Sequence, residues 1–323
     1  MNNRIERVLQ LSEYLEIEIR KNTPLLAESE LENPWFVKIF LDTSISTWAK
    51  NLNRTDLNSL LNNFNHDVNK KIGIVAAGNL PLVGLHDVIV CFLYGCQVRI
   101  KLSNLDHILM KKVIHFLDPE EKQIKIVNQL KNIDAVIATG SNNTFRYFEY
   151  YFRDLPKILR RNRTSVAIIT EDVDHVELEL LADDIFQYFG LGCRNVSKIF
   201  VPQKFEISQL LPHFDKYSWV INHNKFANNY MYRKAIWNMN LDPHWDNGFL
   251  LIKESQKLHA PISTLFLERY SSLKDLNFIS RSEDIQCVVS RDVNHVDFGQ
   301  SQSPKITSFA DNIDTTVFLS DIK

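Results

Sequence analysis

The sequence predicts an α/β protein built on mostly parallel sheets with helices on both faces. From Lys71 to Val201, short apolar runs typical of buried strands alternate with longer segments of helical periodicity. The residues before Lys71 are polar and show helical spacing without a strand pattern. The chain has 323 residues, which suffices for one large domain or two ordinary ones.

Residues 1–66 are predicted to form a helical N-terminal segment. Apolar side chains between Ile5 and Leu15 recur at helical spacing. Pro24 and Pro34 divide the segment into shorter helices, because proline interrupts the hydrogen bonds of a helix.

Residues 67–172 are predicted to form a first α/β domain. Gly78 ends its first apolar run, and Pro81 opens the helix that follows. The expected strands cover residues 72–77, 98–102, 123–127, 134–138 and 165–170. The expected helices cover residues 81–95, 105–117 and 142–152.

Residues 173–300 are predicted to form a second α/β domain, and residues 301–323 a C-terminal segment. The expected helices cover residues 176–189, 205–214 and 225–238, and the expected strands 199–201, 248–252, 262–267 and 285–290. Within the C-terminal segment, Thr315 to Leu319 is predicted to be an isolated strand. Such a strand typically returns to a sheet in another domain or pairs with a sheet in another subunit, and the second alternative would make the protein a homo-oligomer.

Composition excludes several classes of protein. Lysine and arginine number 37 against 39 aspartate and glutamate, so no strong positive field attracts nucleic acid or membrane. The N-terminus shows no apolar signal core, and the longest apolar stretch, Val88 to Tyr94, is too short to span a bilayer. We therefore expect a cytoplasmic protein with reduced cysteines and no nucleic-acid or membrane-spanning role.

Cys193 stands out among the four cysteines. No pair has C-x-x-C spacing and no histidine cluster accompanies them, so we expect no metal site. Cys91 and Cys96 lie in an apolar segment and are expected to be packed thiols. Gly190 and Gly192 precede Cys193, and small neighbours leave room for a carbonyl to approach the sulfur. This pattern favours a nucleophile, with a packed hydrophobic cysteine as the alternative.

Three further segments follow predicted strands, where ligands bind in doubly wound sheets. The Asn79 amide can donate a hydrogen bond to negative charge on a carbonyl oxygen. Lys101 can hold a ribose or phosphate, and Gly140 and Ser141 precede a helix whose N-terminus suits a pyrophosphate. Taken singly, each has a structural alternative: a turn at Asn79, a solvated lysine at Lys101, and a helix cap at Ser141 or Asn142.

Other charged residues have structural interpretations. His86 and Asp87 are expected to be a satisfied pair near the N-terminus of a helix, with proton relay as the alternative. Arg160, Arg161 and Arg163 are expected in a solvated loop, with contacts to coenzyme A phosphates as the alternative.

In their order along the chain, the Asn79, Lys101, Gly140–Ser141 and Cys193 segments resemble the aldehyde dehydrogenase superfamily. The closer resemblance is to its long-chain acyl-CoA reductase branch, which includes the reductase component of the bacterial bioluminescence fatty-acid reductase. The similarity extends from about Lys71 to the C-terminus, where Phe298–Gln302 and Asp311–Thr315 resemble the ending of that branch. It implies an aldehyde-dehydrogenase-like fold, with a modified Rossmann cofactor domain at 67–172 and an α/β catalytic domain at 173–300.

The resemblance also implies a role for each motif residue. Cys193 would be the nucleophile that becomes acylated, and Asn79 with the backbone N–H of Cys193 would form the oxyanion hole. Lys101 would contact the adenosine ribose or its 2′-phosphate, and Gly140 and Ser141 would lie beside the cofactor pyrophosphate. Arg194 and Lys198, which are near Cys193 in sequence, are expected to favour its thiolate.

Two departures from the superfamily pattern narrow the expected activity. Hydrolytic members carry a glutamate ahead of the strand at 165–170, where this chain reads Leu159–Thr164 without an acid. Water attack on an acyl-cysteine would then be slow, and a thiol such as coenzyme A is the expected partner. Many NAD-preferring members have a glutamate three residues after the lysine; Asn104 stands there, which favours tolerance of NADPH or preference for it.

The sequence therefore predicts NAD(P)H-dependent reduction of an acyl-CoA or acyl thioester to the aldehyde through an acyl-cysteine. The alternatives are a hydrolytic aldehyde dehydrogenase and a non-catalytic protein that retains the fold. NADPH, or NADH, is the expected cofactor. The acyl group is expected to arrive on coenzyme A or an acyl carrier, with delivery by a partner acyl-protein synthetase as a further alternative.

Overall fold

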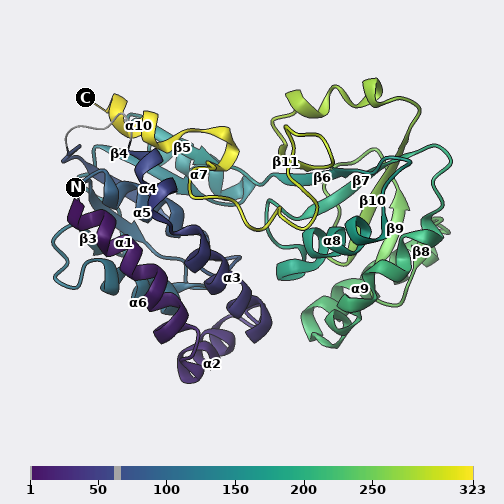
Figure 1. Ribbon diagram of the computed structural model, residues 1–323, viewed down its shortest axis with the longest axis horizontal. Helices are drawn as coiled ribbons and strands as arrows, with labels where there is room; N and C mark the ends of the chain where they lie inside the picture. The colour runs from purple at the N-terminus through teal and green to yellow at the C-terminus, as the bar shows by residue number, and fades with distance from the viewer. Residues whose placement is uncertain (1, 62–66, 323) are drawn as a thin grey trace. The chain divides into compact units, whose positions relative to one another are not determined.

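The computed structural model describes residues 2–61 and 67–322. The chain divides into two compact units (Figure 1), namely Met1–Asn162 together with Pro304–Lys323, and Arg163–Ser303. Each unit contains one sheet. The chain therefore completes the second unit as a continuous stretch and then returns to the first.

Five parallel strands form the sheet of the first unit, in the order β3–β2–β1–β4–β5. The strands are β1 (Lys71–Val75), β2 (Gln97–Lys101), β3 (Ile124–Ile126), β4 (Ala135–Thr139) and β5 (Lys157–Arg160). The chain builds outward from β1 to β3 and then resumes on the other side of β1. A reversal of this kind creates the switch point where doubly wound sheets bind ligands.

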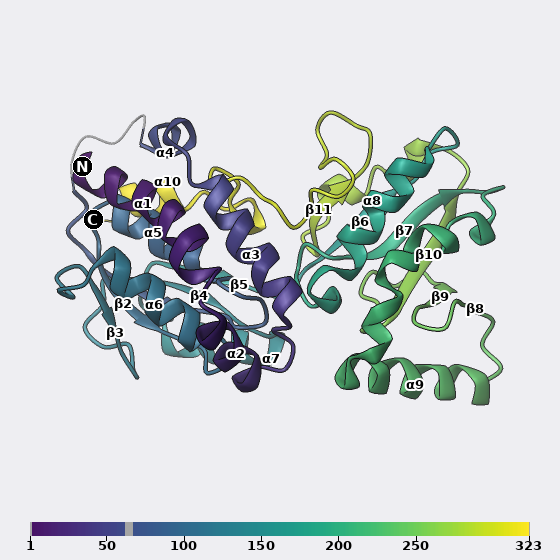
Figure 2. The same ribbon diagram turned by 60° about the horizontal axis from the view of Figure 1, so that its bottom comes forward.

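The helices of the first unit surround this sheet (Figures 1 and 2). Those that precede the second unit are α1 (Asn2–Tyr14), the π-helix η1 (Leu15–Ile19), α2 (Thr23–Glu32), α3 (Lys38–Asn51), α4 (Arg54–Leu60), α5 (Leu85–Leu93), α6 (His107–Leu117) and α7 (Asn142–Tyr151). The predicted helical character of the N-terminal segment is confirmed for its described part, while residues 62–66 lie outside the described residues. Because Val8 and Leu11 belong to the same hydrophobic core as α5, this segment is part of the first unit.

Helix α5 is enclosed by the core of the first unit. Every residue of α5 except His86 is buried, as expected for a helix that is apolar on nearly all sides. Cys91 and Cys96 are fully buried, which confirms that they are packed thiols. Within residues 2–61 and 67–322, no helix has both the length and the apolar composition that crossing a membrane requires.

Six strands form the sheet of the second unit, in the order β11–β6–β7–β10–β9–β8, and only the pair β8–β9 is antiparallel. The strands are β6 (Thr164–Ile168), β7 (Val196–Pro202), β8 (Trp245–Asp246), β9 (Leu251–Glu254), β10 (Thr264–Tyr270) and β11 (Ile285–Val289). The helices are α8 (His175–Phe186), α9 (Asn224–Met239) and the 3-10 helices η2 (Gln187–Gly190), η3 (Ile207–Gln209), η4 (Leu211–Asn222), η5 (Leu273–Leu276) and η6 (Ile279–Arg281). The helix expected at 205–214 is thus replaced by 3-10 turns.

Strand β6 corrects the predicted boundary between the two α/β regions. It corresponds to the strand expected at 165–170 in the first domain, but it pairs with β7 and β11 of the second sheet. The units therefore divide between Asn162 and Arg163 instead of after residue 172. Apolar patterning identifies a strand, but the sheet to which the strand belongs depends on pairing partners that are distant in the sequence.

Strand β5 was not expected, and it corrects the solvated loop predicted at Arg160. The Arg160 side chain is buried, and its guanidinium donates to both carboxylate oxygens of Asp87 at 2.5 and 2.9 Å. Burial opposes ionisation of Asp87, but attraction to Arg160 prevails and holds the pKa of that carboxyl far below its ordinary value. Asp87 is therefore a satisfied residue of α5, with Arg160 in place of His86 as its main partner.

The strand predicted at Thr315–Leu319 is wrong, because this segment forms helix α10 (Thr315–Asp321) after the 3-10 turn η7 (Ala310–Asn312). The Asp314 carboxylate caps α10 by accepting the N–H groups of Thr316 and Val317 at 2.8 and 3.3 Å. A short run of β-branched and apolar residues fits a strand or a helix, and the cap favours the helix. Helix α10 packs against α5 of the same chain (Figure 1). Because the segment is helical, the strand on which pairing between subunits was predicted does not form.

Candidate active site

Four of the predicted site residues lie at the carboxyl edge of the first sheet. Asn79 follows β1, Lys101 ends β2, and Gly140 and Ser141 follow β4. Because β2, β1 and β4 are adjacent and parallel, their carboxyl ends lie side by side. The structure thus gathers these four residues within one unit, whereas Cys193 belongs to the second.

Side chains from two N-terminal helical segments hold the loop that carries Asn79. The Asn33 amide donates to the carbonyl of Gly78 at 3.4 Å, and the Ser44 hydroxyl donates to the carbonyl of Pro81 at 2.8 Å. Asn79 itself is exposed between these two anchored positions. The helical N-terminal segment therefore contributes directly to the placement of a candidate site residue.

The turn from this loop into α5 is strained and anchored by a buried acid. Leu82 adopts a φ of 59°, a conformation that is costly for a residue other than glycine. Its N–H donates to the Asp106 carboxylate at 2.7 Å. Burial raises the pKa of Asp106 well above its ordinary value, although the bond from Leu82 acts in the opposite direction. The contact ties the turn after β1 to the segment after β2.

The loops that follow β1 and β2 are in close contact. A Cβ atom on Gly78 would lie 2.4 Å from the Ser103 hydroxyl oxygen, so the contact requires glycine at this position. Lys101 and Asn104 are exposed on the β2 side of this junction. The close approach therefore places an exposed cation next to the loop that carries Asn79.

Ser141 caps helix α7 at the end of β4. Its hydroxyl oxygen accepts the N–H of Thr144 at 3.3 Å, so the helix-cap interpretation is confirmed. The cap places the N-terminus of α7 at the sheet edge, where backbone N–H groups attract anionic oxygens. A Cβ atom on Gly140 would approach Phe148 to 3.0 Å, so glycine permits the tight passage from β4 into α7.

Cys193 is exposed at the corner of a turn between α8 and β7. The N–H of Asn195 donates to the carbonyl of Gly192 at 3.1 Å, which makes Cys193 and Arg194 the central residues of a β-turn. The exposure of Cys193 excludes the alternative of a packed hydrophobic cysteine.

The backbone that leads into this turn adopts an uncommon conformation. Tyr188, Phe189 and Gly190 have φ values of 55°, 57° and 75°, and the first two lack glycine's freedom to adopt them. Both aromatic side chains are buried, and the Phe189 ring packs against His223 and Phe226. Aromatic packing therefore compensates the backbone strain and holds the chain that presents Cys193.

Ser165 on β6 connects the Cys193 turn with a second cysteine. Its hydroxyl donates to the backbone carbonyl of Cys193 at 3.0 Å and lies 3.0 Å from the Cys287 sulfur on β11. Burial raises the pKa of the Cys287 thiol, although Arg194 opposes the effect. Cys287 is thus a half-buried thiol whose proton is retained more tightly than usual, in contrast with the exposed Cys193.

The two cations expected to favour the Cys193 thiolate each interact with another side chain of the second unit. Lys198 is buried on β7 and forms an ion pair with Glu268 on β10. The Arg194 side chain interacts with Cys287. Lys198 is thus paired within its own sheet, and Arg194 lies close to the second thiol.

Asp184, Ser165 and Asn195 are buried polar residues that the sequence analysis missed. The Asp184 carboxylate accepts the backbone N–H groups of Gly299 and Ser301 at 2.7 and 2.9 Å. Burial raises the pKa of Asp184 to about 6 despite these bonds. The sequence offered one indication that Asp184 is buried, namely its position on the apolar face of the helix predicted at 176–189. Asp184 ties α8 to the chain that leaves the second unit.

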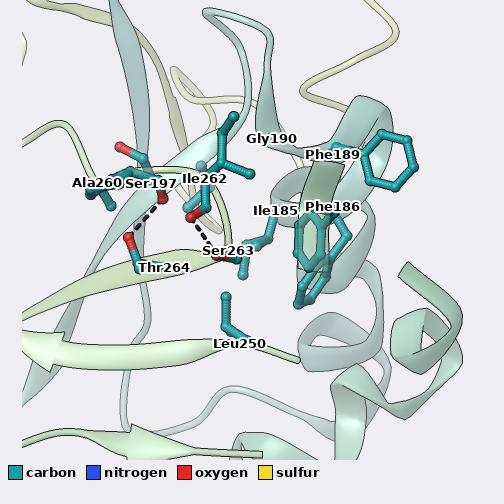
Figure 3. Close-up of a pocket in the computed structure, with 13 residues that line it drawn as sticks. Ile185, Phe186, Phe189, Gly190, Ser197, Leu250, Ala260, Ile262, Ser263 and Thr264 are labelled. Carbon is teal, nitrogen blue, oxygen red and sulfur yellow. Dashed lines mark hydrogen bonds between the residues drawn. The ribbon is translucent and has the colours of Figure 1, made fainter. Parts of the chain in front are cut away.

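A small pocket lies beside the Cys193 turn (Figure 3). Phe186 lies on one side and Ala260 and Ile262 on the other, with Leu250 below them. The lining residues nearest to the turn in sequence are Gly190, Val196 and Ser197. The hydroxyls of Ser263 and Thr264 donate to the backbone carbonyls of Ile262 and Pro261 at 2.5 and 2.7 Å, so both are already engaged within their own segment. Cys193 is not among the lining residues. The pocket is therefore not where its sulfur would meet a carbonyl.

Solved structures provide the comparison that identifies the fold. The NAD+ complex of aldehyde dehydrogenase from Bacillus cereus is similar with a TM-score of 0.65 at 13% identity, over 90% of this chain and 72% of that chain. The NAD-dependent aldehyde dehydrogenase from Sinorhizobium meliloti is similar with a TM-score of 0.64 at 12% identity, over 90% and 71% of the two chains. The chain has the aldehyde dehydrogenase fold.

An NADP-dependent enzyme from E. coli is also similar to this chain, with a TM-score of 0.63 at 10% identity over 90% of this chain and 74% of that chain. No family model and no curated protein matches the sequence. The predicted fold class is confirmed, with a Rossmann-like first unit, a second α/β unit and a helical N-terminal segment. Across residues 2–61 and 67–322, no group of histidine, cysteine, aspartate and glutamate side chains has an arrangement that would hold a metal ion.

Proposed function

We propose that this protein is an oxidoreductase that uses NAD(P)H to reduce an acyl thioester, such as an acyl-CoA, to the aldehyde. The observation that carries the proposal is the exposed Cys193 on a glycine-flanked turn of the aldehyde dehydrogenase fold. A sulfur at such a corner is accessible to a carbonyl carbon, and nucleophilic attack there produces an acyl-cysteine.

In the proposed reaction the Cys193 thiolate attacks the carbonyl carbon of the substrate thioester. A bond forms between Sγ and that carbon, the bond from the carbon to the sulfur of coenzyme A breaks, and coenzyme A leaves as a thiolate. The sequence resemblance assigns Asn79 and the N–H of Cys193 to the oxyanion of the intermediate. One such donor lowers the barrier by about 3–4 kcal/mol.

The carboxyl edge of the first sheet fits a nicotinamide dinucleotide. The N-terminus of α7 at Ser141 offers backbone donors for a pyrophosphate, and Gly140 keeps the approach from β4 narrow. Lys101 is exposed at the neighbouring strand end and would hold the adenosine ribose. When bound, the cofactor would supply the hydride that reduces the acyl group on Cys193.

Charge at this edge favours NADPH over NADH. The Lys101 ammonium would attract a 2′-phosphate, and Asn104 is neutral where a glutamate would repel it. We therefore propose NADPH as the preferred cofactor.

A thiol is proposed as the partner of the acyl group because neither residues 159–164 nor Asp184 supplies a free carboxylate that could activate water. Residues 159–164 contain no carboxylate. Asp184, whose raised pKa would suit a base, has both oxygens engaged by the backbone of Gly299 and Ser301. Without a general base, hydrolysis of an acyl-cysteine is slow and acyl exchange with coenzyme A competes well.

Intact-protein mass spectrometry after incubation with acetyl-CoA, octanoyl-CoA and palmitoyl-CoA tests the proposal. We expect one acyl adduct on the wild-type protein, none on Cys193→Ala, and an undiminished adduct on the matched thiol variant Cys287→Ala. Adding NADPH should then oxidise the cofactor and release the acyl group as the aldehyde.

Three outcomes would change the assignment. An acyl adduct that persists in Cys193→Ala would refute the assignment of Cys193 as the nucleophile. Release of free acid without coenzyme A or NADPH would favour the hydrolytic alternative. Labelling of Cys193 by an acyl-carrier thioester, but by none of the coenzyme A esters, would support Cys193 as the nucleophile and identify an acyl carrier as the acyl donor.

A further inference from the structure

We infer that Asn195 is a positioning residue whose side-chain amide fastens the turn carrying Cys193 to the end of helix α8. The inference rests on the proposed function, because only a nucleophilic Cys193 must be aligned with a substrate carbonyl. Asn195 follows the cysteine by two residues and is only 2% exposed, which is unusual for a turn asparagine.

The amino group of Asn195 faces the C-terminal end of α8. Its Nδ2 atom donates to the backbone carbonyls of Asp184, Ile185 and Gln187 at 3.1, 3.4 and 2.8 Å. Carbonyls at the end of a helix lack partners within the helix, and an unpartnered buried carbonyl is destabilising. One side chain therefore serves two carbonyls in the last turn of α8 and that of Gln187, which follows the helix.

The carbonyl oxygen of the same side chain holds the other side of the turn. Its Oδ1 atom accepts the N–H of Gly192, the residue immediately before Cys193, at 2.8 Å. The main chain of Asn195 adds a bond to the Gly192 carbonyl at 3.1 Å and accepts the N–H of Ser165 on β6 at 3.2 Å. The flanks of Cys193 are thus tied to both α8 and β6 through one residue.

An asparagine suits this position because it donates and accepts at once. Aspartate has nearly the same shape, but it would lose both donated protons and direct an oxygen at three carbonyls. Alanine would remove the side-chain bonds altogether. Asn195→Asp therefore separates the effect of hydrogen bonding from the effect of side-chain volume.

The expected result is a loss of acylation rate that exceeds the loss of thiol reactivity. Misplacing a reacting group by about 1 Å costs about 100-fold in rate. We expect Asn195→Asp and Asn195→Ala to become acylated by octanoyl-CoA about 100-fold more slowly at saturation, with little change in KM. Alkylation of Cys193 by iodoacetamide, which needs no aligned carbonyl, should stay close to the wild-type rate.

Asn247→Asp is the matched control in the same unit. Asn247 Oδ1 accepts the N–H of Leu250 at 2.8 Å on the turn before β9, and the substitution keeps this acceptor. We expect wild-type acylation in this variant. Wild-type acylation in Asn195→Asp would overturn the inference, as would equal losses of acylation and alkylation.

A measurement on the wild-type protein covers the case in which the Asn195 variants do not fold. The bond to Asn195 should protect the Gly192 amide from hydrogen exchange, and exchange at the rate of an unstructured chain would refute the contact. If no acyl-CoA labels wild-type Cys193, the proposed function fails. Protection of Gly192 would still decide whether Asn195 holds the turn.

Discussion

The residues proposed to bind the cofactor and the proposed nucleophile are held in place by different means. Asn79, Lys101 and Ser141 stand at the carboxyl ends of adjacent parallel strands, so their grouping follows from the strand order β2–β1–β4. Cys193 instead precedes β7 and lies at the amino end of its strand. Its position depends on side-chain hydrogen bonds to α8 and β6.

A buried asparagine supports a loop in each unit, and the two illustrate this difference. Asn33 is distant in sequence from the loops it joins, and it donates to the carbonyls of Gly78 and Leu105 at 3.4 and 3.3 Å. Asn195 acts locally and uses both its donor and its acceptor. The position of the Asn79 loop at the sheet edge is determined mostly by the strands that flank it. The Cys193 turn follows a helix and is held mainly by its own side-chain hydrogen bonds.

The largest expected effect concerns the stability of the first unit. Arg160→Ala leaves the buried Asp87 carboxylate without its main partner, so the free energy of unfolding should fall by about 3–5 kcal/mol. Urea unfolding followed by circular dichroism measures the change. Arg161→Ala, which alters an exposed side chain, serves as the control and should have little effect. Unchanged stability in Arg160→Ala would show that this ion pair does not hold β5 to α5.

The next effect concerns the Asn79 loop. Asn79→Ala should slow acylation of Cys193 by about 100- to 1,000-fold, because the substitution removes one oxyanion donor. Rapid-quench mass spectrometry measures the rate, and Asn128→Ala, at the exposed end of the edge strand β3, is the control. A decrease of less than about tenfold would exclude Asn79 from the oxyanion hole.

Asp184 should make the second unit less stable as the pH rises. Burial raises the pKa of Asp184 from 3.8 to about 6, so the folded state binds the proton more tightly than the unfolded state. The resulting stabilisation is complete below about pH 4 and lost as the pH rises through about 6, a change of about 3 kcal/mol. Urea unfolding across this range should show a falling stability that Asp184→Asn lacks. Parallel pH profiles for the two proteins would contradict the assignment.

The smallest expected effect concerns cofactor choice at the sheet edge. Asn104→Glu should raise the KM for NADPH about fivefold with little change for NADH, because an exposed charge near a phosphate costs about 1 kcal/mol. Steady-state kinetics with both cofactors measures the ratio, and Asn104→Gln is the neutral control. If the ratio stays constant in Asn104→Glu, the 2′-phosphate does not lie at this edge.

Local sequence patterns predicted much of the first sheet. Strand β4 is a continuous apolar run from Ala135 to Ala138, and all four residues are fully buried, as in parallel strands covered on both faces. Strand β5 escaped notice because Lys157 and Arg160 flank only two apolar residues. The burial of Arg160 at the end of this strand is explained by its ion pair with Asp87, which the sequence pattern does not reveal.

Residue order alone was enough to recognise an α/β chain and to place Asn79, Lys101, Ser141 and Cys193 at the ends of its elements. These features depend on periodicity and glycine placement over a few neighbouring residues. Folding in three dimensions decided that β6 joins the second sheet, that the last segment is helical, and that Arg160 and Asp184 are buried. Such outcomes depend on partners far along the chain, as in the pair of Arg160 and Asp87, which are 73 residues apart.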